Sequence, residues 1–126
     1  MKLFRRLVLA AVVVLLVGLM TTPAMANKAS LQIEAPAEVS PGTTITIKLN
    51  VTHKGNNWFH YTNWVRVSVN GSELKRWEFS RSNRPENENF TLTVTYAVTA
   101  PIEIVAEANC NMHGSEGPAT VTVNAK

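Results

Sequence analysis

A single cysteine and three histidines are the residues of this chain whose types and spacing could hold a metal ion. Cys110 and His113 stand three residues apart in CNMHG (110–114), and His53 and His60 flank a loop rich in glycine and asparagine. One soft sulfur and three imidazoles suit iron, copper or zinc, whereas calcium and magnesium prefer oxygen ligands. A metal centre is therefore the first hypothesis for these four residues.

Residues 1–26 have the features of a secretory signal peptide. Basic residues at the amino end precede an apolar stretch over 7–20, and Ala24-Met25-Ala26 forms a small-x-small cleavage site. The apolar stretch is shorter than the roughly 20 residues that span a bilayer. We expect export by the general route rather than the twin-arginine route, and a periplasmic mature domain, residues 27–126, without a membrane anchor.

The net charge of +3 comes mainly from the predicted signal peptide. Lys2, Arg5 and Arg6 belong to that segment, and removing these three from the 12 basic residues leaves 9, against 9 acidic residues. A balanced charge gives no basis for binding to nucleic acid or to a membrane surface. The mature domain is small but long enough to bury one core.

The hydrophobic pattern of the mature domain predicts strands rather than helices. Residues 45–53 alternate between apolar and polar side chains, which is typical of a half-buried strand, and Asn70-Gly71 is a strong hairpin signal. We expect about seven strands, at residues 31–35, 43–53, 63–70, 73–79, 89–97, 102–109 and 119–125. Short strands at regular spacing predict an all-β fold, an immunoglobulin-like antiparallel β-sandwich.

The same alternation places two of the candidate ligands. His53 ends the apolar face of one expected strand, and Cys110 leaves the apolar side of another. If the two strand ends meet at one pole of the sandwich, a thiol and an imidazole converge there.

A simpler interpretation is that Cys110 is an inert part of the core, because lone cysteines are commonly small buried hydrophobes. An internal disulfide is excluded in a chain with one cysteine. A free thiol in an exported protein is liable to oxidation unless it is buried or coordinated, which favours the metal. The aromatic residues near His60 fit either ordinary core or an apolar shell around a metal: Trp58, Phe59, Tyr61 and Trp64.

Three segments resemble the superoxide reductases, the neelaredoxin and desulfoferrodoxin group. HYTNWVRV (60–67) is similar to a histidine-containing segment of that family, and CNMHG (110–114) is close to its CNLHG. LQIEAPAEVSPG (31–42) resembles its lead-in to the first long strand. The likeness covers nearly the whole mature domain, and the combination is more specific than any one segment.

The resemblance implies a cofactor and an activity. In that family an immunoglobulin-like domain holds one non-haem iron by four equatorial histidines and one axial cysteine thiolate, and superoxide is reduced to hydrogen peroxide. Carried over, Cys110 is the axial ligand and His53, His60 and His113 are equatorial. Superoxide is then the expected substrate and an unidentified electron-donor protein the expected partner. A homo-oligomer is also compatible with the resemblance.

The sequence departs from the family pattern at the first ligand. Asn27, Lys28 and Ala29 stand where the family has glutamate, lysine and histidine, so one imidazole is missing. The family leaves the sixth position on the iron open for superoxide, and Lys28 is kept as the expected catalytic positive charge near that position. The α-amine of Asn27, the first residue after the predicted cleavage, is a candidate to replace the imidazole. The interval between His53 and His60 is also one residue longer than in the family.

Two other functions are compatible with the sequence. A blue-copper electron carrier is also a β-sandwich with an upstream histidine and a Cys-x-x-His pair, so copper is the second choice of metal. Such proteins usually add a methionine about five residues after the histidine, whereas GSEGP (114–118) follows here. A metal-free binding module with Cys110 in its core is the third hypothesis.

Overall fold

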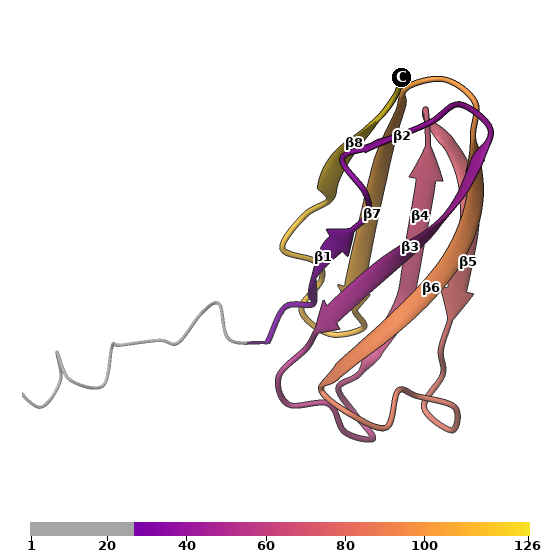
Figure 1. Ribbon diagram of the computed structural model, residues 1–126. Helices are drawn as coiled ribbons and strands as arrows, with labels where there is room; N and C mark the ends of the chain where they lie inside the picture. The colour runs from indigo at the N-terminus through magenta and orange to yellow at the C-terminus, as the bar shows by residue number, and fades with distance from the viewer. Residues whose placement is uncertain (1–26) are drawn as a thin grey trace, which may run out of the picture.

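The structure, a computed structural model, describes residues 27–126 (Figure 1). These residues form eight strands and contain no helix. The strands are β1 (Ser30–Glu34), β2 (Glu38–Val39), β3 (Thr43–Thr52), β4 (Thr62–Val69), β5 (Ser72–Glu78), β6 (Asn89–Val98), β7 (Ile102–Cys110) and β8 (Ala119–Ala125). Seven of them match the predicted strands closely, and the short β2 is additional. Since residues 27–126 contain no helix, none of them forms a helix able to cross a membrane. The predicted signal peptide lies outside the described residues.

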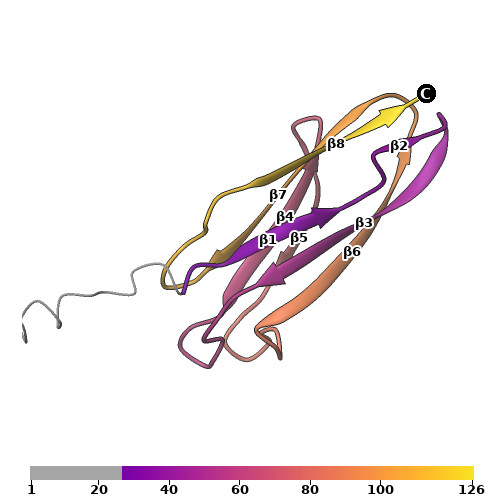
Figure 2. The same cartoon turned by 60° about the vertical axis from the view of Figure 1, so that its left-hand side comes forward.

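The strands form two sheets that lie against each other as the layers of a sandwich (Figures 1 and 2). One sheet has the order β1-β3-β6 and the other the order β2-β8-β7-β4-β5. All neighbouring strands are antiparallel except β2 and β8, which pair in parallel over two residues. The predicted immunoglobulin-like β-sandwich is confirmed, with this one short parallel pair added.

Alternate residues of the strands fill the space between the sheets. On β3 the buried residues are the apolar ones that the alternating pattern predicted. His53, which directly follows β3, continues this inward face and is also buried. On β7 every even position from Ile102 to Cys110 is buried. Each fully buried valine, leucine or isoleucine contributes about 1.5–3 kcal/mol relative to an exposed one. These buried apolar side chains therefore stabilise the packing of the two sheets.

The β4–β5 hairpin has the turn that its sequence predicted. Asn70 and Gly71 have φ values of 49° and 82°. Two successive residues with positive φ are the mark of a type I′ turn, which suits the twist of a two-residue hairpin.

A β-bulge near the beginning of β4 changes which side chains face inward. Thr62 pairs with Cys110 whereas Trp64 pairs with Asn109, so β4 has one extra residue at this point. Bulges re-aim side chains in this way. As a result Thr62 is buried even though the alternation of the following residues, with Val65 inward, would place it outward.

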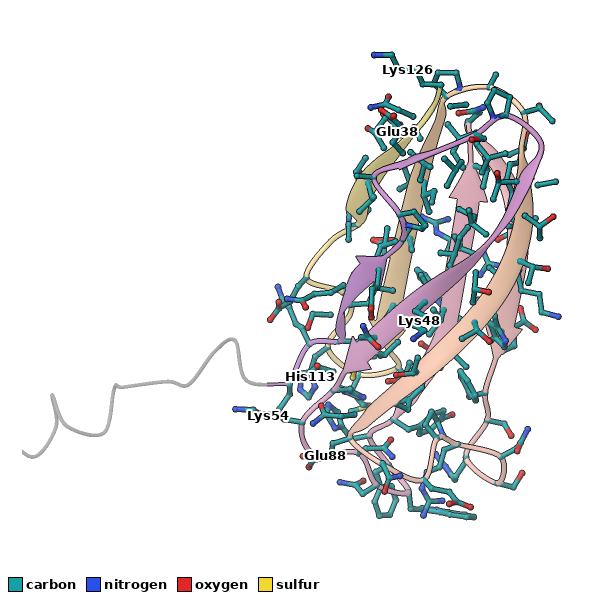
Figure 3. The ribbon with its side chains drawn as sticks, viewed as in Figure 1. Glu38, Lys48, Lys54, Glu88, His113 and Lys126 are labelled. Carbon is teal, nitrogen blue, oxygen red and sulfur yellow. The ribbon has the colours of Figure 1, made fainter. Side chains whose placement is uncertain are left out.

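The candidate site lies at the end of the sandwich where the described chain begins. His113, Lys54 and Glu88 lie at this end, while Glu38 and Lys126 lie at the opposite end (Figure 3).

Candidate metal centre

Three potential metal ligands meet at this pole. The donor atoms of His53, His60 and Cys110 all lie within 4.8 Å of one another, and all three residues are buried. His53 directly follows β3 of the three-stranded sheet, and Cys110 ends β7 of the five-stranded sheet. The predicted convergence of these two strand ends is confirmed, and the loop between β3 and β4 adds His60.

His53 is held by a hydroxyl in the core. Nδ1 of its ring lies 3.0 Å from Oγ1 of Thr62, and its backbone N–H donates to the carbonyl of Glu88 over 2.8 Å. Burial lowers the pKa of His53 below its usual 6.5, and the nearby His60 lowers the pKa further. A neutral ring whose Nδ1–H donates to Thr62 leaves Nε2 free to bind a metal.

His60 is fixed by the loop that carries it. Its Nδ1 lies 2.8 Å from the carbonyl oxygen of Gly55, and because a carbonyl only accepts, Nδ1 carries the proton. The side-chain oxygen of Asn57 accepts hydrogen bonds from the backbone N–H groups of Phe59 and His60. Gly55 has a φ of +80°, and a Cβ there would lie 3.4 Å from Nδ1 of His60. The ring therefore presents Nε2 toward His53, with the two Nε2 atoms 3.3 Å apart.

The sulfur of Cys110 accepts two backbone hydrogen bonds. The N–H groups of Met112 and His113 donate to Sγ over 3.4 and 3.3 Å. The turn is closed by reciprocal backbone bonds between Cys110 and Gly114, of 2.9 and 3.0 Å. N–H groups aimed at sulfur stabilise negative charge on it, and in iron–sulfur sites such bonds influence the reduction potential.

Asn111 joins the two loops of the site. Its side-chain oxygen accepts from the N–H of Tyr61, its side-chain nitrogen donates to the carbonyl of Phe59, and its own N–H donates to the carbonyl of Tyr61. The loop with His60 and the loop with Cys110 are thereby locked together.

His113, the fourth predicted ligand, lies at the margin of this cluster. Its Nδ1 is 3.9 Å from Sγ of Cys110, and its ring centroid is 4.8 Å from that of His60. In contrast to the other three, its side chain is exposed, and it is outside the set whose donor atoms all lie within 4.8 Å of one another.

The residues around the missing imidazole also lie at this pole. Ala29 is fully buried, and the β1–β3 register, in which Ser30 pairs with Thr52, places residue 29 opposite His53 when continued by one step. Lys28 is half-buried and makes no ion pair within residues 27–126. The carbonyl oxygen of Asn27 lies 3.2 Å from Nε2 of His53 and 3.1 Å from Nε2 of His60.

Two of the four aromatic residues near His60 belong neither to the hydrophobic core nor to an apolar shell around the site. Trp58 and Phe59 are 48% and 68% exposed, and the guanidinium of Arg81 lies over both rings. Tyr61 and Trp64 are half-buried. The apolar shell that the sequence allowed is thus at most partial, because the loop turns two of its aromatic rings toward solvent.

The sequence did not single out three residues that support the site, Gly55, Thr62 and Asn111. Gly55 lies in the loop already recognised as rich in glycine and asparagine, and Thr62 lies in the HYTNW segment. Their roles depend on a positive φ, a bulge and a loop contact, none of which an alternation pattern reports.

Known proteins share both sequence features and fold with this chain. The Desulfoferrodoxin family matches residues 21–115. The superoxide reductase (neelaredoxin) from Ignicoccus hospitalis has a similar structure, with a TM-score of 0.68 and 20% identity over 85% of this chain and 89% of that chain. A putative superoxide reductase from Thermotoga maritima has a TM-score of 0.59 and 22% identity over 77% of this chain and 86% of that chain.

A similar sandwich also occurs outside these named reductases. The CARDB domain of a Pyrococcus furiosus protein, solved in complex with di-metal ions, has a TM-score of 0.63 and 21% identity over 81% of this chain and 90% of that chain. No curated protein sequence matches the chain. At these identities the solved structures establish the fold alone.

Proposed function

Because the chain belongs to the desulfoferrodoxin family, we propose that it is a mononuclear non-haem iron protein that reduces superoxide to hydrogen peroxide. Cys110, His53, His60 and His113 are the proposed ligands. The observation that carries the proposal is the convergence of two buried imidazoles and one buried thiol at a single point.

The donor set fits a transition metal. Nδ1 of each buried imidazole has a hydrogen-bond partner, Thr62 for His53 and Gly55 for His60, which supports Nε2 as the metal-binding atom of both. A thiol sulfur beside imidazole nitrogens suits iron, copper or zinc and is a poor match for calcium or magnesium. The burial of all three residues limits the access of water to the bonds they would form.

Iron bound by these residues would supply the one-electron couple that the reaction requires. One electron and two protons convert superoxide to hydrogen peroxide, and we propose that a separate donor protein supplies the electron. The sulfur of Cys110 would donate electron density to the metal, and the N–H groups of Met112 and His113, which stabilise negative charge on the sulfur, would limit that donation. The positive charge of Lys28 attracts the superoxide anion to this pole.

A second candidate is an electron-transfer protein without superoxide turnover. The alanine at position 29 favours it, because the family pattern has a metal-binding histidine at that position. Copper is the less favoured metal for such a carrier. Met112, the methionine between Cys110 and His113, is 65% exposed, so its side chain is poorly placed to serve as an axial thioether.

Metal content and the visible spectrum of the purified protein separate these possibilities. We expect iron near one atom per chain and a ferric thiolate band, and Cys110→Ser should abolish the band while keeping the β-sheet circular dichroism. Ala108→Ser is the matched control, because it adds a hydroxyl to the same buried face of β7 but should keep the colour. Each substitution should cost about 1–2 kcal/mol of stability.

A superoxide assay then tests the reaction. We expect hydrogen peroxide in a one-to-one ratio to superoxide consumed, in the presence of a reductant and without release of dioxygen. A coloured iron protein with no turnover would favour the electron carrier. A colourless protein, or an unchanged band in Cys110→Ser, would contradict the metal centre itself.

We also propose that the protein acts outside the cytoplasm. The support is the signal-peptide pattern of residues 1–26. Fractionation of expressing cells, with amino-terminal sequencing of the mature form, tests export. Retention of an uncleaved chain in the cytoplasm would contradict it.

A further inference from the structure

The backbone carbonyl of Asn27 lies against both buried imidazoles. Its oxygen is 3.2 Å from Nε2 of His53 and 3.1 Å from Nε2 of His60, and these two nitrogens are 3.3 Å apart. Three electron-pair donors thus form a nearly equilateral triangle at the centre of the site.

When both imidazoles are neutral and carry their proton at Nδ1, toward Thr62 and Gly55, no hydrogen bond accounts for this triangle. A carbonyl oxygen only accepts, and the neutral ring of His60 uses its single proton at Nδ1, toward Gly55. The contact between Nε2 of His60 and the oxygen of Asn27 then has no proton in it. Two lone pairs at 3.1 Å repel each other unless a proton on Nε2 of His53 or a metal ion lies beside both.

The separations match those of neighbouring ligands of one metal ion. Metal–ligand bonds of about 2.1 Å place adjacent donors about 3.0 Å apart at right angles and about 3.4 Å apart in a tetrahedron. The three distances, 3.1, 3.2 and 3.3 Å, lie between these values.

We propose that the backbone carbonyl oxygen of Asn27 is a metal ligand, in the place of the imidazole that is missing at position 29. This inference rests on the proposed metal centre. A main-chain oxygen needs no particular side chain, so the ligand is preserved when residue 27 is substituted.

The backbone around Asn27 is anchored to the cysteine loop. The N–H of Ala29 donates to the carbonyl of Gly114 over 3.3 Å, and the N–H of Glu116 donates to the carbonyl of Ala29 over 2.9 Å. These two bonds fix the chain two residues after Asn27 and hold its carbonyl over the imidazoles. A neutral oxygen is a weaker donor to iron than an imidazole, so this ligand should exchange with added ligands more readily than a histidine would.

Isotope labelling of the full chain tests the proposal without relying on activity. The protein is made by cell-free synthesis with asparagine labelled with ¹³C at the backbone carbonyl, loaded with ferric iron, and studied by electron–nuclear double resonance. We expect resolved ¹³C couplings in the parent, one of which Asn27→Ala should lose, because its carbonyl is then unlabelled. The other labelled asparagines, including Asn109 and Asn111 beside Cys110, are present in both proteins, so the difference between the two spectra belongs to residue 27. The iron affinity of Asn27→Ala should stay within about twofold of the parent.

Three results would overturn the inference while leaving the iron centre intact. They are a ferric thiolate band without any ¹³C coupling in the parent, identical ¹³C couplings in the parent and in Asn27→Ala, and a loss of iron affinity of tenfold or more in that variant, as expected for a side-chain ligand. Absence of iron binding and of the thiolate band in the parent would instead contradict the proposed function, and this inference with it.

Discussion

Oγ1 of Thr62 lies 3.0 Å from Nδ1 of His53, and the two side chains are 0% and 1% exposed. A neutral imidazole has one proton, so a partner for Nδ1 determines whether Nε2 is free. The β4 bulge, which pairs Thr62 with Cys110, is what brings this hydroxyl to the metal side of the strand.

We expect Thr62→Val to lower the metal affinity of the protein by about tenfold or more, as is typical when a residue that orients a ligand is lost. Valine has nearly the same shape but cannot accept the Nδ1 proton of His53. Competition with a metal chelator measures the change. Thr62→Ser, which keeps the hydroxyl, should stay close to the parent, and equal losses in the two variants would show that shape rather than hydrogen bonding matters.

Gly55→Ala should weaken both the fold and the metal centre. An alanine at a φ of +80° costs about 1–2 kcal/mol, and its Cβ would lie 3.4 Å from Nδ1 of His60. Gly42→Ala is the control, because Gly42 has a φ of +91° with nothing within 4 Å of the added Cβ. We expect similar losses of unfolding free energy but reduced metal affinity for Gly55→Ala only. Equal metal affinities would contradict the contact with His60.

The metal-free protein should lose stability as the pH falls below about 6.5. The folded-state pKa of His53 is lowered from 6.5, so the unfolded chain binds a proton more readily than the folded one. The contribution of His53 is therefore present above pH 6.5 and is lost as the pH falls through the lower folded-state pKa. Urea unfolding at several pH values, compared between the parent and His53→Gln, isolates it. A parent and variant with the same pH dependence would contradict the prediction.

Ala29→His should raise iron affinity by about tenfold, or 1.4 kcal/mol. The β1–β3 register, continued by one step beyond Ser30 and Thr52, places residue 29 opposite His53, and a new imidazole is a stronger donor than a backbone oxygen. Ala29→Leu fills similar space without adding a ligand and should give no gain. If the histidine variant binds iron no better than the leucine variant, the side chain of residue 29 does not face the metal.

The sequence predicts the sandwich and the buried ligands for the same reason. Alternation with a period of two predicts which residues of β3 and β7 lie in the core. It also predicts that His53 and Cys110, at the ends of these strands, point inward. The convergence of the two strand ends could therefore be expected before the structure was known. Asn70-Gly71 likewise fixed the hairpin, because its backbone geometry is local.

The rest depends on features without such a periodic signature. The bulge reverses the alternation at Thr62, so that residue could not be assigned to the site. Trp58 and Phe59 turn outward because of the loop path and not their hydrophobicity. For Asn27 the sequence identified the residue and suggested its α-amine, whereas the atom that lies beside the imidazoles is its carbonyl oxygen, which every residue possesses.

The two strand ends at the metal pole belong to different sheets. His53 follows β3 in the three-stranded sheet, while Cys110 ends β7 in the five-stranded sheet. An ion bound by both would fasten the layers together, as an inter-sheet disulfide does in antibody domains. Cys110 is a free cysteine, so the link between the layers would depend on the bound metal and would be lost when the metal leaves. Resistance to proteolysis at this pole should therefore rise and fall with the supply of iron.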